Sequence, residues 1–250
     1  MTSGHHRPAR VRTYPDDCVQ AIIQDPSRWW VPDEGHTLCR GALLYCFVAH
    51  TDQVPYQFEP VGRTVPTEHG SATVKVSPLK VGEPLKPVTA LPVAALPLKP
   101  GEVWAAYRAK RRPCIVISDE CPTVDRGLTK GMPNATTAPT MLVAPFYGAD
   151  KDGSRAGFND GFIDRIRHCE YPQFMWDQLP LEGGPQTSIL RLDQIQPIGR
   201  HYHAYKTCGW KLSDDALAVF DDLIHWQIWG GVPEGSDLVA FRELMQATFG

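Results

Sequence analysis

Proline is the feature that most limits what this chain can fold into. Of its 250 residues, 23 are proline, nearly twice the usual share of ~5%. Proline has no backbone N–H and clashes with the preceding helical turn, so it interrupts long helices and central strands. The prolines therefore argue against a helical bundle and favour short strands joined by turns.

The remaining composition is that of a globular protein. Hydrophobic residues make up 42% of the chain and charged residues 21%, which argues against a chain that is mostly disordered or coiled coil. The formal net charge of −3 excludes a protein that is basic overall, so any contact with nucleic acid must come from a local patch.

Hydropathy and cysteine usage predict the compartment. The longest apolar stretch, residues 42–49, is far shorter than the ~20 residues that cross a bilayer, and no apolar segment typical of a secretory signal follows the basic opening residues. The seven cysteines form no CxxC pair, and an odd number suits a reducing compartment. We expect a cytoplasmic protein with free thiols and no membrane partner.

Local patterns divide the chain. A short helix near residues 18–23 and a small β unit are predicted within residues 1–77, which we interpret as an N-terminal domain. The runs that predict its strands are residues 42–49, 56–62 and 71–76. Six prolines between Pro78 and Pro100 predict an extended linker over residues 78–100, because such a density forbids a helix or a central strand.

The second half is predicted to be mostly sheet, followed by helices. Runs of β-branched and aromatic residues predict strands at residues 101–108, 114–118, 141–147 and 187–195. Two long polar stretches interrupt them, residues 119–140 and 148–170, the second with a helical turn near 162–167. The segment CRGALLYCFVAH loosely echoes KPGEVWAAYRAK.

Two helices are predicted to close the chain. Ser213 offers an N-cap, and the acidic residues after it complement the helix dipole. The apolar stripe of this helix is Leu217, Phe220, Leu223, Ile224 and Ile228. Gly230 ends it, and a second helix is predicted from Ser236 to Gln246.

An arginine and an aspartate in SILRLDQIQPIG are candidates for chemistry. Alternate side chains of a strand share a face, so Arg191 and Asp193 would lie on one side, with Cβ atoms ~7 Å apart. Both could then address one phosphate and the hydroxyl beside it. The same two residues also fit an ordinary surface ion pair, which contributes little to stability.

A second candidate is the basic stretch RAKRRPCIVIS, which contains Arg108, Lys110, Arg111 and Arg112. The planar guanidinium group suits phosphate oxygens. Basic residues before a buried strand are equally typical of a solvated turn. Charge alone does not decide between these interpretations.

Taken together, these segments resemble the PemK/MazF toxin family. In order along the chain stand GEVW, a basic turn ending in Arg-Arg-Pro, CIVIS, LVAPFYG, and SILRLDQIQPIG before a capped helix. The family has a Gly-Asp/Glu-Ile-Trp strand, an Arg-Pro turn into a hydrophobic strand, a Val-Pro strand and an Arg-x-Asp-Gln strand. The resemblance covers about residues 99–230. It implies an SH3-like small barrel, usually a homodimer, that cleaves single-stranded RNA without metal or cofactor under control of an antitoxin.

The resemblance also implies roles for individual residues. Asp193 matches the general base, Arg191 the general acid and Arg112 the arginine that stabilises the phosphate. Since the pKa of arginine exceeds ~12, we interpret Arg191 mainly as an electrostatic stabiliser. The expected substrate-binding residues are Arg111, Lys110, Tyr147 and Arg108. Two departures are the Tyr147-Gly148 pair, where the family has Thr or Ser, and the short turn at residues 107–112.

The predicted fold is therefore mainly β with appended helices (α+β): a PemK/MazF-like barrel with its C-terminal helix at residues 101–230 and a packing helix at 231–250. A non-catalytic module that binds nucleic acid or protein in a defence or stress-response complex would have the same fold and remains an alternative. In a third interpretation the N-terminal unit regulates the groove in cis. No metal site is predicted, because His201, His203 and Cys208 match no standard zinc spacing.

Overall fold

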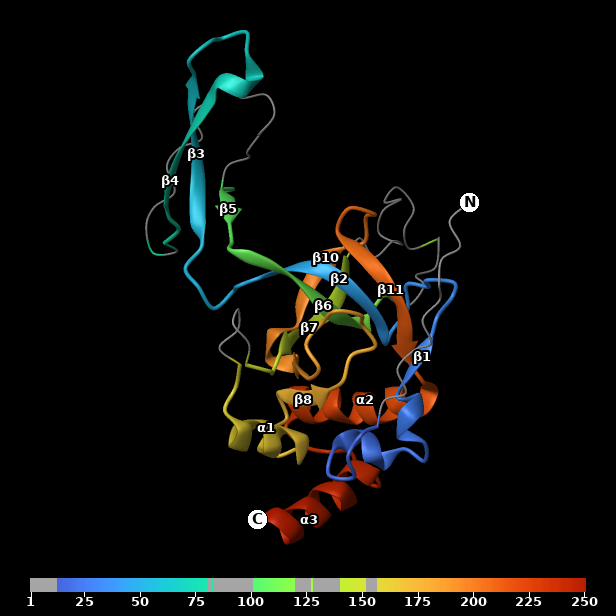
Figure 1. Ribbon diagram of the computed structural model, residues 1–250. Coiled ribbons are helices and arrows are strands. Elements are labelled where there is room, and N and C mark those ends of the chain that lie inside the picture. The colour runs from blue at the N-terminus through green and yellow to red at the C-terminus, as the bar shows by residue number, and fades with distance from the viewer. Residues whose placement is uncertain (1–12, 81, 83–100, 120–126, 128–139, 152–156) are drawn as a thin grey trace. The chain divides into compact units, whose positions relative to one another are not determined.

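The computed structural model forms two compact units, Met1–Phe47 with Arg111–Gly250 (the larger unit) and Val48–Lys110 (the smaller unit). It describes residues 13–80, 82, 101–119, 127, 140–151 and 157–250 (Figure 1). Among these residues, no helix is long and apolar enough to span a membrane.

The larger unit is built on an eight-stranded sheet. Its strands are β1 (Trp30–Pro32), β2 (Ala42–Ala49), β6 (Ala109–Ser118), β7 (Thr140–Gly148), β8 (Phe174–Asp177), β9 (Ser188–Arg191), β10 (Gln196–Gly199) and β11 (Tyr205–Leu212). The order is β1-β11-β2-β6-β7-β9-β8, and β10 also pairs with β7. Within the described part of the chain this order ends at β1 and β8, so the sheet is open and the closed SH3-like barrel is not formed.

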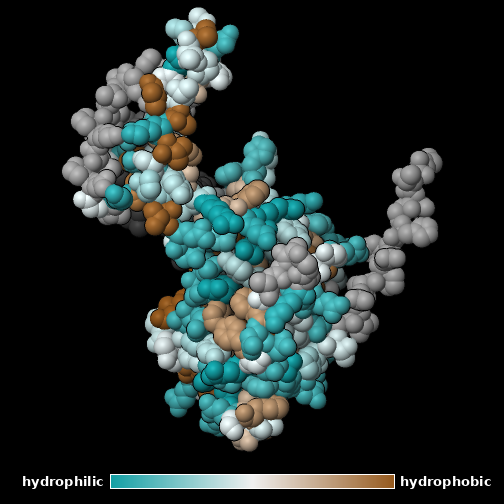
Figure 2. Space-filling view, turned by 60° about the vertical axis from the view of Figure 1, so that its left-hand side comes forward, coloured by the Kyte–Doolittle hydropathy of each residue, from teal (hydrophilic) through white to brown (hydrophobic). Residues whose placement is uncertain are grey.

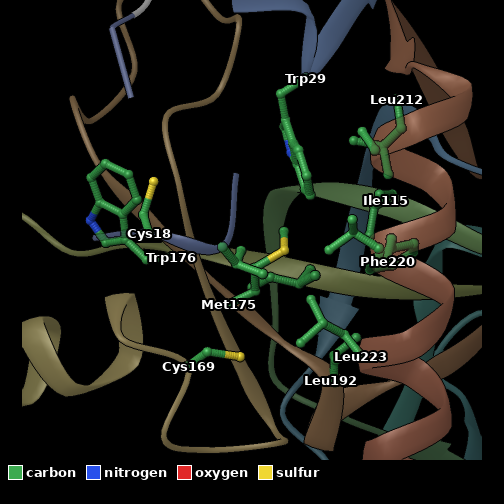
Figure 3. Close-up of a cluster of buried hydrophobic side chains, with 14 of the residues drawn as sticks. Cys18, Trp29, Ile115, Cys169, Met175, Trp176, Leu192, Leu212, Phe220 and Leu223 are labelled. Carbon is green, nitrogen blue, oxygen red and sulfur yellow. The ribbon is translucent and has the colours of Figure 1, made fainter. Parts of the chain in front are cut away.

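The central strands β6 and β7 are continuous apolar runs. Residues 114–117 and 143–146 are buried throughout, which is typical of strands covered on both faces. Side chains from these strands meet Trp29, Phe220 and Leu223 in the core (Figure 3). The fold class is thus mainly β with helices, as predicted.

Helix α2 (Asp214–Trp229) confirms the predicted capped helix. The Ser213 side chain accepts a hydrogen bond from the Ala216 N–H, and Gly230 ends the helix in the left-handed conformation at φ 79°. The buried face of α2 differs from the predicted apolar stripe at the end of the helix. Trp226 is 9% exposed, whereas Ile228, a member of the predicted stripe, is 54% exposed. Which side of the last turn is buried depends on the neighbouring elements rather than on helical spacing.

The other helices follow their local signals. Asn159 caps α1 (Asp160–Arg167), where a helical turn was predicted, and Ser236 caps α3 (Asp237–Phe249). The predicted N-terminal helix is a 3-10 helix, η1 (Val19–Ile22). Two further 3-10 helices are η2 (Pro26–Arg28) and η3 (His69–Ser71).

The N-terminal residues belong to the larger unit. β1 and β2 both pair with β11, and the Tyr14 hydroxyl donates to buried Asp177 at 2.8 Å. Trp30 Nε1 also donates to Asp177, at 3.2 and 3.1 Å to its two oxygens. The two units therefore do not follow the predicted division at residues 1–77 and 101–230, because pairing between distant strands leaves no local signal. The predicted linker at 78–100 lies mostly outside the described residues.

The smaller unit contains a three-stranded sheet in the order β4-β3-β5. Its strands are β3 (Tyr56–Arg63), β4 (Ala72–Pro78) and β5 (Trp104–Ala106). Phe58 lies opposite both Val76 and Trp104, so these residues share one apolar face. Hydrophobic side chains gather on this unit in Figure 2, and several are exposed.

The smaller unit also contains the start of the predicted barrel, residues 101–110. Of the GEVW segment, residues 101–104, only Trp104 belongs to a strand, β5, which pairs with β3 rather than with β6. The strand next to β6 in the larger sheet is β2, from the CRGALLYCFVAH segment. The smaller unit is therefore inserted in the chain between two neighbouring strands of the larger sheet.

Candidate functional site

The candidate site lies where three paired strands of the larger unit meet a short turn. β6 pairs with β7 so that Cys114 is opposite Pro145, which places Arg112 across from Tyr147. Tyr147 pairs in turn with Ile189 of β9, and Arg191 is the last residue of that strand. Because residues two apart on a strand share a face, Arg112, Tyr147 and Arg191 lie on the same side of the sheet.

Arg191 and Asp193 form a bidentate ion pair. Arg191 Nε donates to Asp193 Oδ1 at 2.7 Å, and Arg191 Nη2 donates to Oδ2 at 2.5 Å. The two side chains are 23% and 32% exposed, so the pair lies at the surface. The strand that was predicted to continue through Asp193 ends at Arg191, and the 3-10 turn η5 (Leu192–Gln194) carries the carboxylate. The turn brings the two groups together more directly than strand alternation would.

The Tyr147 ring lies against two guanidinium groups. The distance from Cζ to the ring centroid is 3.6 Å for Arg112 and 5.5 Å for Arg191. The Tyr147 hydroxyl donates to Gln194 Oε1. Both distances are within the ~6 Å range of cation–π attraction, so the ring helps to position two cations. The predicted part of Tyr147 in substrate binding stays a prediction.

Burial and charge act on Arg112 in opposite directions. Burial, the largest cause, lowers the pKa of Arg112; the neighbouring Tyr147 raises it, and the positive charge of Arg191 lowers it further. Among the described residues, no hydrogen-bond partner of the buried Arg112 Nε is found. An unpaired buried N–H is costly.

The four groups make a compact cationic site. Two guanidinium groups and one carboxylate give a net positive charge around Tyr147. Such a site can hold a phosphate against the guanidinium groups and leave a carboxylate oxygen near an adjacent hydroxyl.

The remaining predicted residues are Arg111, Arg108 and Lys110. Arg111 and Arg112 are within β6 rather than on a turn, so alternation directs Arg111 to the opposite face, where its Cζ lies 4.3 Å from the Tyr45 ring centroid. Arg108 and Lys110 are exposed residues of the smaller unit. Their part in substrate binding stays a prediction.

Two residues of the site were not singled out from the sequence. Gln194 accepts from Tyr147, and Phe174 of β8 lies opposite Arg191, with its ring centroid 5.1 Å from Arg191 Cζ. Gln194 had a signal, because it follows Asp193 in the Arg-x-Asp-Gln segment. Phe174 had none, since only the pairing of β8 with β9 brings it to the site.

Metal ligands and relatives give no further assignment. In the described ranges, no group of three or more His, Cys, Asp or Glu side chains is placed to hold a metal ion. A comparison with protein-family models and with curated protein sequences found no match.

Proposed function

We propose that the larger unit is a metal-independent endoribonuclease of the PemK/MazF toxin type, which cleaves single-stranded RNA by attack of the 2′-hydroxyl. The observation that carries the proposal is the convergence of Arg112, Arg191 and Asp193 around Tyr147 at a partly exposed position. In this proposal the strands β2, β6, β7 and β9 correspond to the strands of the toxin barrel.

The reaction assigns one task to each group. The Asp193 carboxylate accepts the proton of the 2′-hydroxyl, whose oxygen attacks the adjacent phosphorus. Arg112 and Arg191 stabilise the negative charge that develops on the phosphate oxygens. The P–O5′ bond breaks, and the leaving oxygen takes a proton from water or from Arg191. The products are a 2′,3′-cyclic phosphate and a 5′-hydroxyl.

Substrate binding has to change the ion pair. Both oxygens of Asp193 accept from Arg191 in the structure, so neither is directed only at a substrate. A bound phosphate competes for the same guanidinium N–H groups, because bidentate contacts suit phosphate and carboxylate alike. We infer that RNA takes over the Arg191 donors and releases one oxygen of Asp193 to act as base.

The same ion pair supports the alternative function. A module that only binds RNA, DNA or a protein partner in a defence or stress-response complex needs the cations and not a free base. The closed Arg191–Asp193 pair fits that role. A homodimer and an antitoxin or other regulatory partner also remain proposals that rest on the resemblance.

The test compares two carboxylates of the larger unit. The full chain is incubated in EDTA with single-stranded RNA, and fragments with cyclic phosphate ends are quantified for wild type, Asp193→Asn and Asp221→Asn. Asp221 is the matched control, since it is also a surface carboxylate paired with an arginine, Arg40.

The nuclease proposal predicts a loss of ~10² to 10⁴-fold in Asp193→Asn, the usual effect of removing a general base, and none in Asp221→Asn. Equal cleavage by wild type and Asp193→Asn would refute the assignment of the base. Absence of cleavage with binding that weakens steeply as salt rises would favour the binding module.

A further inference from the structure

Two buried cysteines from neighbouring strands of the larger sheet are in contact. Cys46 of β2 is 2% exposed and Cys114 of β6 is 0% exposed, and their Sγ atoms lie 3.3 Å apart. The Cys46 thiol donates to the Cys114 sulfur, and the Cys114 thiol donates to the Arg112 carbonyl oxygen at 3.6 Å. The pair thus adjoins the backbone of the candidate site.

The two sulfurs are close enough for a bond to form after a small movement. A disulfide needs its sulfurs at ~2.05 Å, so the two Sγ atoms, which lie 3.3 Å apart, have to approach by about 1.3 Å. Both residues lie on neighbouring strands of one sheet.

The two thiols differ in reactivity. Once Cys46 is ionised, the Cys114 thiol can donate to its sulfur, and this hydrogen bond lowers the pKa of Cys46 while burial acts in the other direction. Burial raises the pKa of Cys114 well above its ordinary value. The thiolate is the nucleophile, so the directions of the two pKa shifts assign the attack on an oxidant to Cys46 and the second step to Cys114.

We propose that Cys46 and Cys114 are a modification site, a dithiol that a small peroxide oxidises to an intramolecular disulfide. The Cys46 thiolate attacks a peroxide oxygen and breaks the O–O bond, which gives a sulfenic acid, while the hydroxide that leaves takes up a proton. The Cys114 sulfur then displaces the sulfenic hydroxyl, which departs as water with the Cys114 proton. Two thiols and one hydrogen peroxide yield one disulfide and two waters.

The disulfide would have two consequences. The smaller unit, Val48–Lys110, lies in the chain between Cys46 and Cys114, so the bond would join the two strands through which the chain leaves and re-enters the larger unit. Oxidation also removes the S–H group that donates to the Arg112 carbonyl. Formation of the disulfide does not depend on the proposed nuclease activity. Only an effect of oxidation on RNA cleavage would rest on that proposal.

The test maps thiols in the oxidised full chain. The protein is treated with hydrogen peroxide and then denatured in the presence of an alkylating reagent, which blocks the remaining thiols. It is digested without reductant, and the peptides are analysed by mass spectrometry. We expect a cross-linked pair of peptides containing Cys46 and Cys114, which disappears on reduction. Buried Cys18, whose thiol donates to the Pro15 carbonyl, is the internal control and should be recovered alkylated.

Three results would overturn the proposal. One is recovery of both Cys46 and Cys114 as alkylated thiols at a peroxide concentration that oxidises half-buried Cys39. Another is a disulfide that joins Cys46 to Cys39 or Cys208. The last is irreversible oxidation of Cys46 to a sulfinic acid while Cys114 remains a thiol. Wild-type protein is sufficient for all three, so no variant has to fold.

Discussion

The Tyr147 ring, which lies against two guanidinium groups, leads to a prediction that does not depend on function. Replacing Tyr147 by leucine removes the π face that Arg112 contacts at 3.6 Å but keeps an apolar side chain in β7. Replacing it by phenylalanine keeps the ring and removes only the hydroxyl that donates to Gln194. The two substitutions therefore separate the contribution of the ring from that of the hydrogen bond.

The expected magnitude follows from the half-buried position of Arg112. Cation–π contacts contribute ~0.5–1 kcal/mol at exposed sites and ~2 kcal/mol when desolvated, so we expect a coupling of about 1 kcal/mol between Arg112 and the ring. In a double-mutant cycle, Tyr147→Leu and Arg112→Met should destabilise the larger unit by less together than the sum of their separate effects. Tyr147→Phe keeps the ring contact, so its own cycle with Arg112→Met should give a coupling near zero. Alone it should cost only the ~0.5–1.5 kcal/mol of a hydrogen bond.

The assay is urea unfolding followed by tryptophan fluorescence. Of the seven tryptophans, only Trp104 lies in the smaller unit, so the signal reports mainly on the larger one. A coupling free energy near zero in the Tyr147→Leu cycle would show that the ring does not hold Arg112. A coupling of about 1 kcal/mol in the Tyr147→Phe cycle would instead assign it to the hydroxyl.

Three other predictions concern stability. Tyr14→Phe should lower the free energy of unfolding by ~1.5–3 kcal/mol, because it removes a hydrogen bond to the buried Asp177 carboxyl. The control Tyr202→Phe, at an 81% exposed position, should have no effect, and equal effects of the two substitutions would contradict this reasoning. Ser213→Ala should cost ~1 kcal/mol in the same urea assay through loss of the α2 cap, and an unchanged midpoint would argue against the cap. Burial raises the pKa of Cys18 from 9.0 to about 12. The unfolded state therefore loses this proton at lower pH than the folded state, and the free energy of unfolding should fall as pH rises from 9.0 to about 12. Cys18→Ala should flatten this part of the pH profile of urea unfolding, and an unchanged slope would count against the prediction.

Helix α2 shows which features can be predicted from local chemistry. Ser213, the acidic residues after it and Gly230 mark both ends of α2, and the structure confirms the cap and the left-handed ending. Helix ends are determined by hydrogen bonds within a few residues, so a sequence window contains the necessary information. The exposure of Ile228 is the exception, because burial of the last turn depends on what packs against it.

The candidate site shows a mixture of local and distant determinants. Arg112, Arg191 and Asp193 were chosen for side-chain chemistry and order along the chain, and the structure places them together. The 3-10 turn that pairs Arg191 with Asp193 was not predicted, since alternation assumes that the strand continues. Phe174 enters only because β8 pairs with β9.

The sequence alone was sufficient for the α2 helix, for most strands and for the residues that make the site cationic, because these depend on neighbours along the chain. Only the tertiary structure decided that β2 rather than β5 lies beside β6, and that Cys46 meets Cys114. Strand partners are selected by hydrogen bonds and burial shared between segments far apart in the chain. That information is absent from any short stretch of residues and arises only when the whole chain is packed.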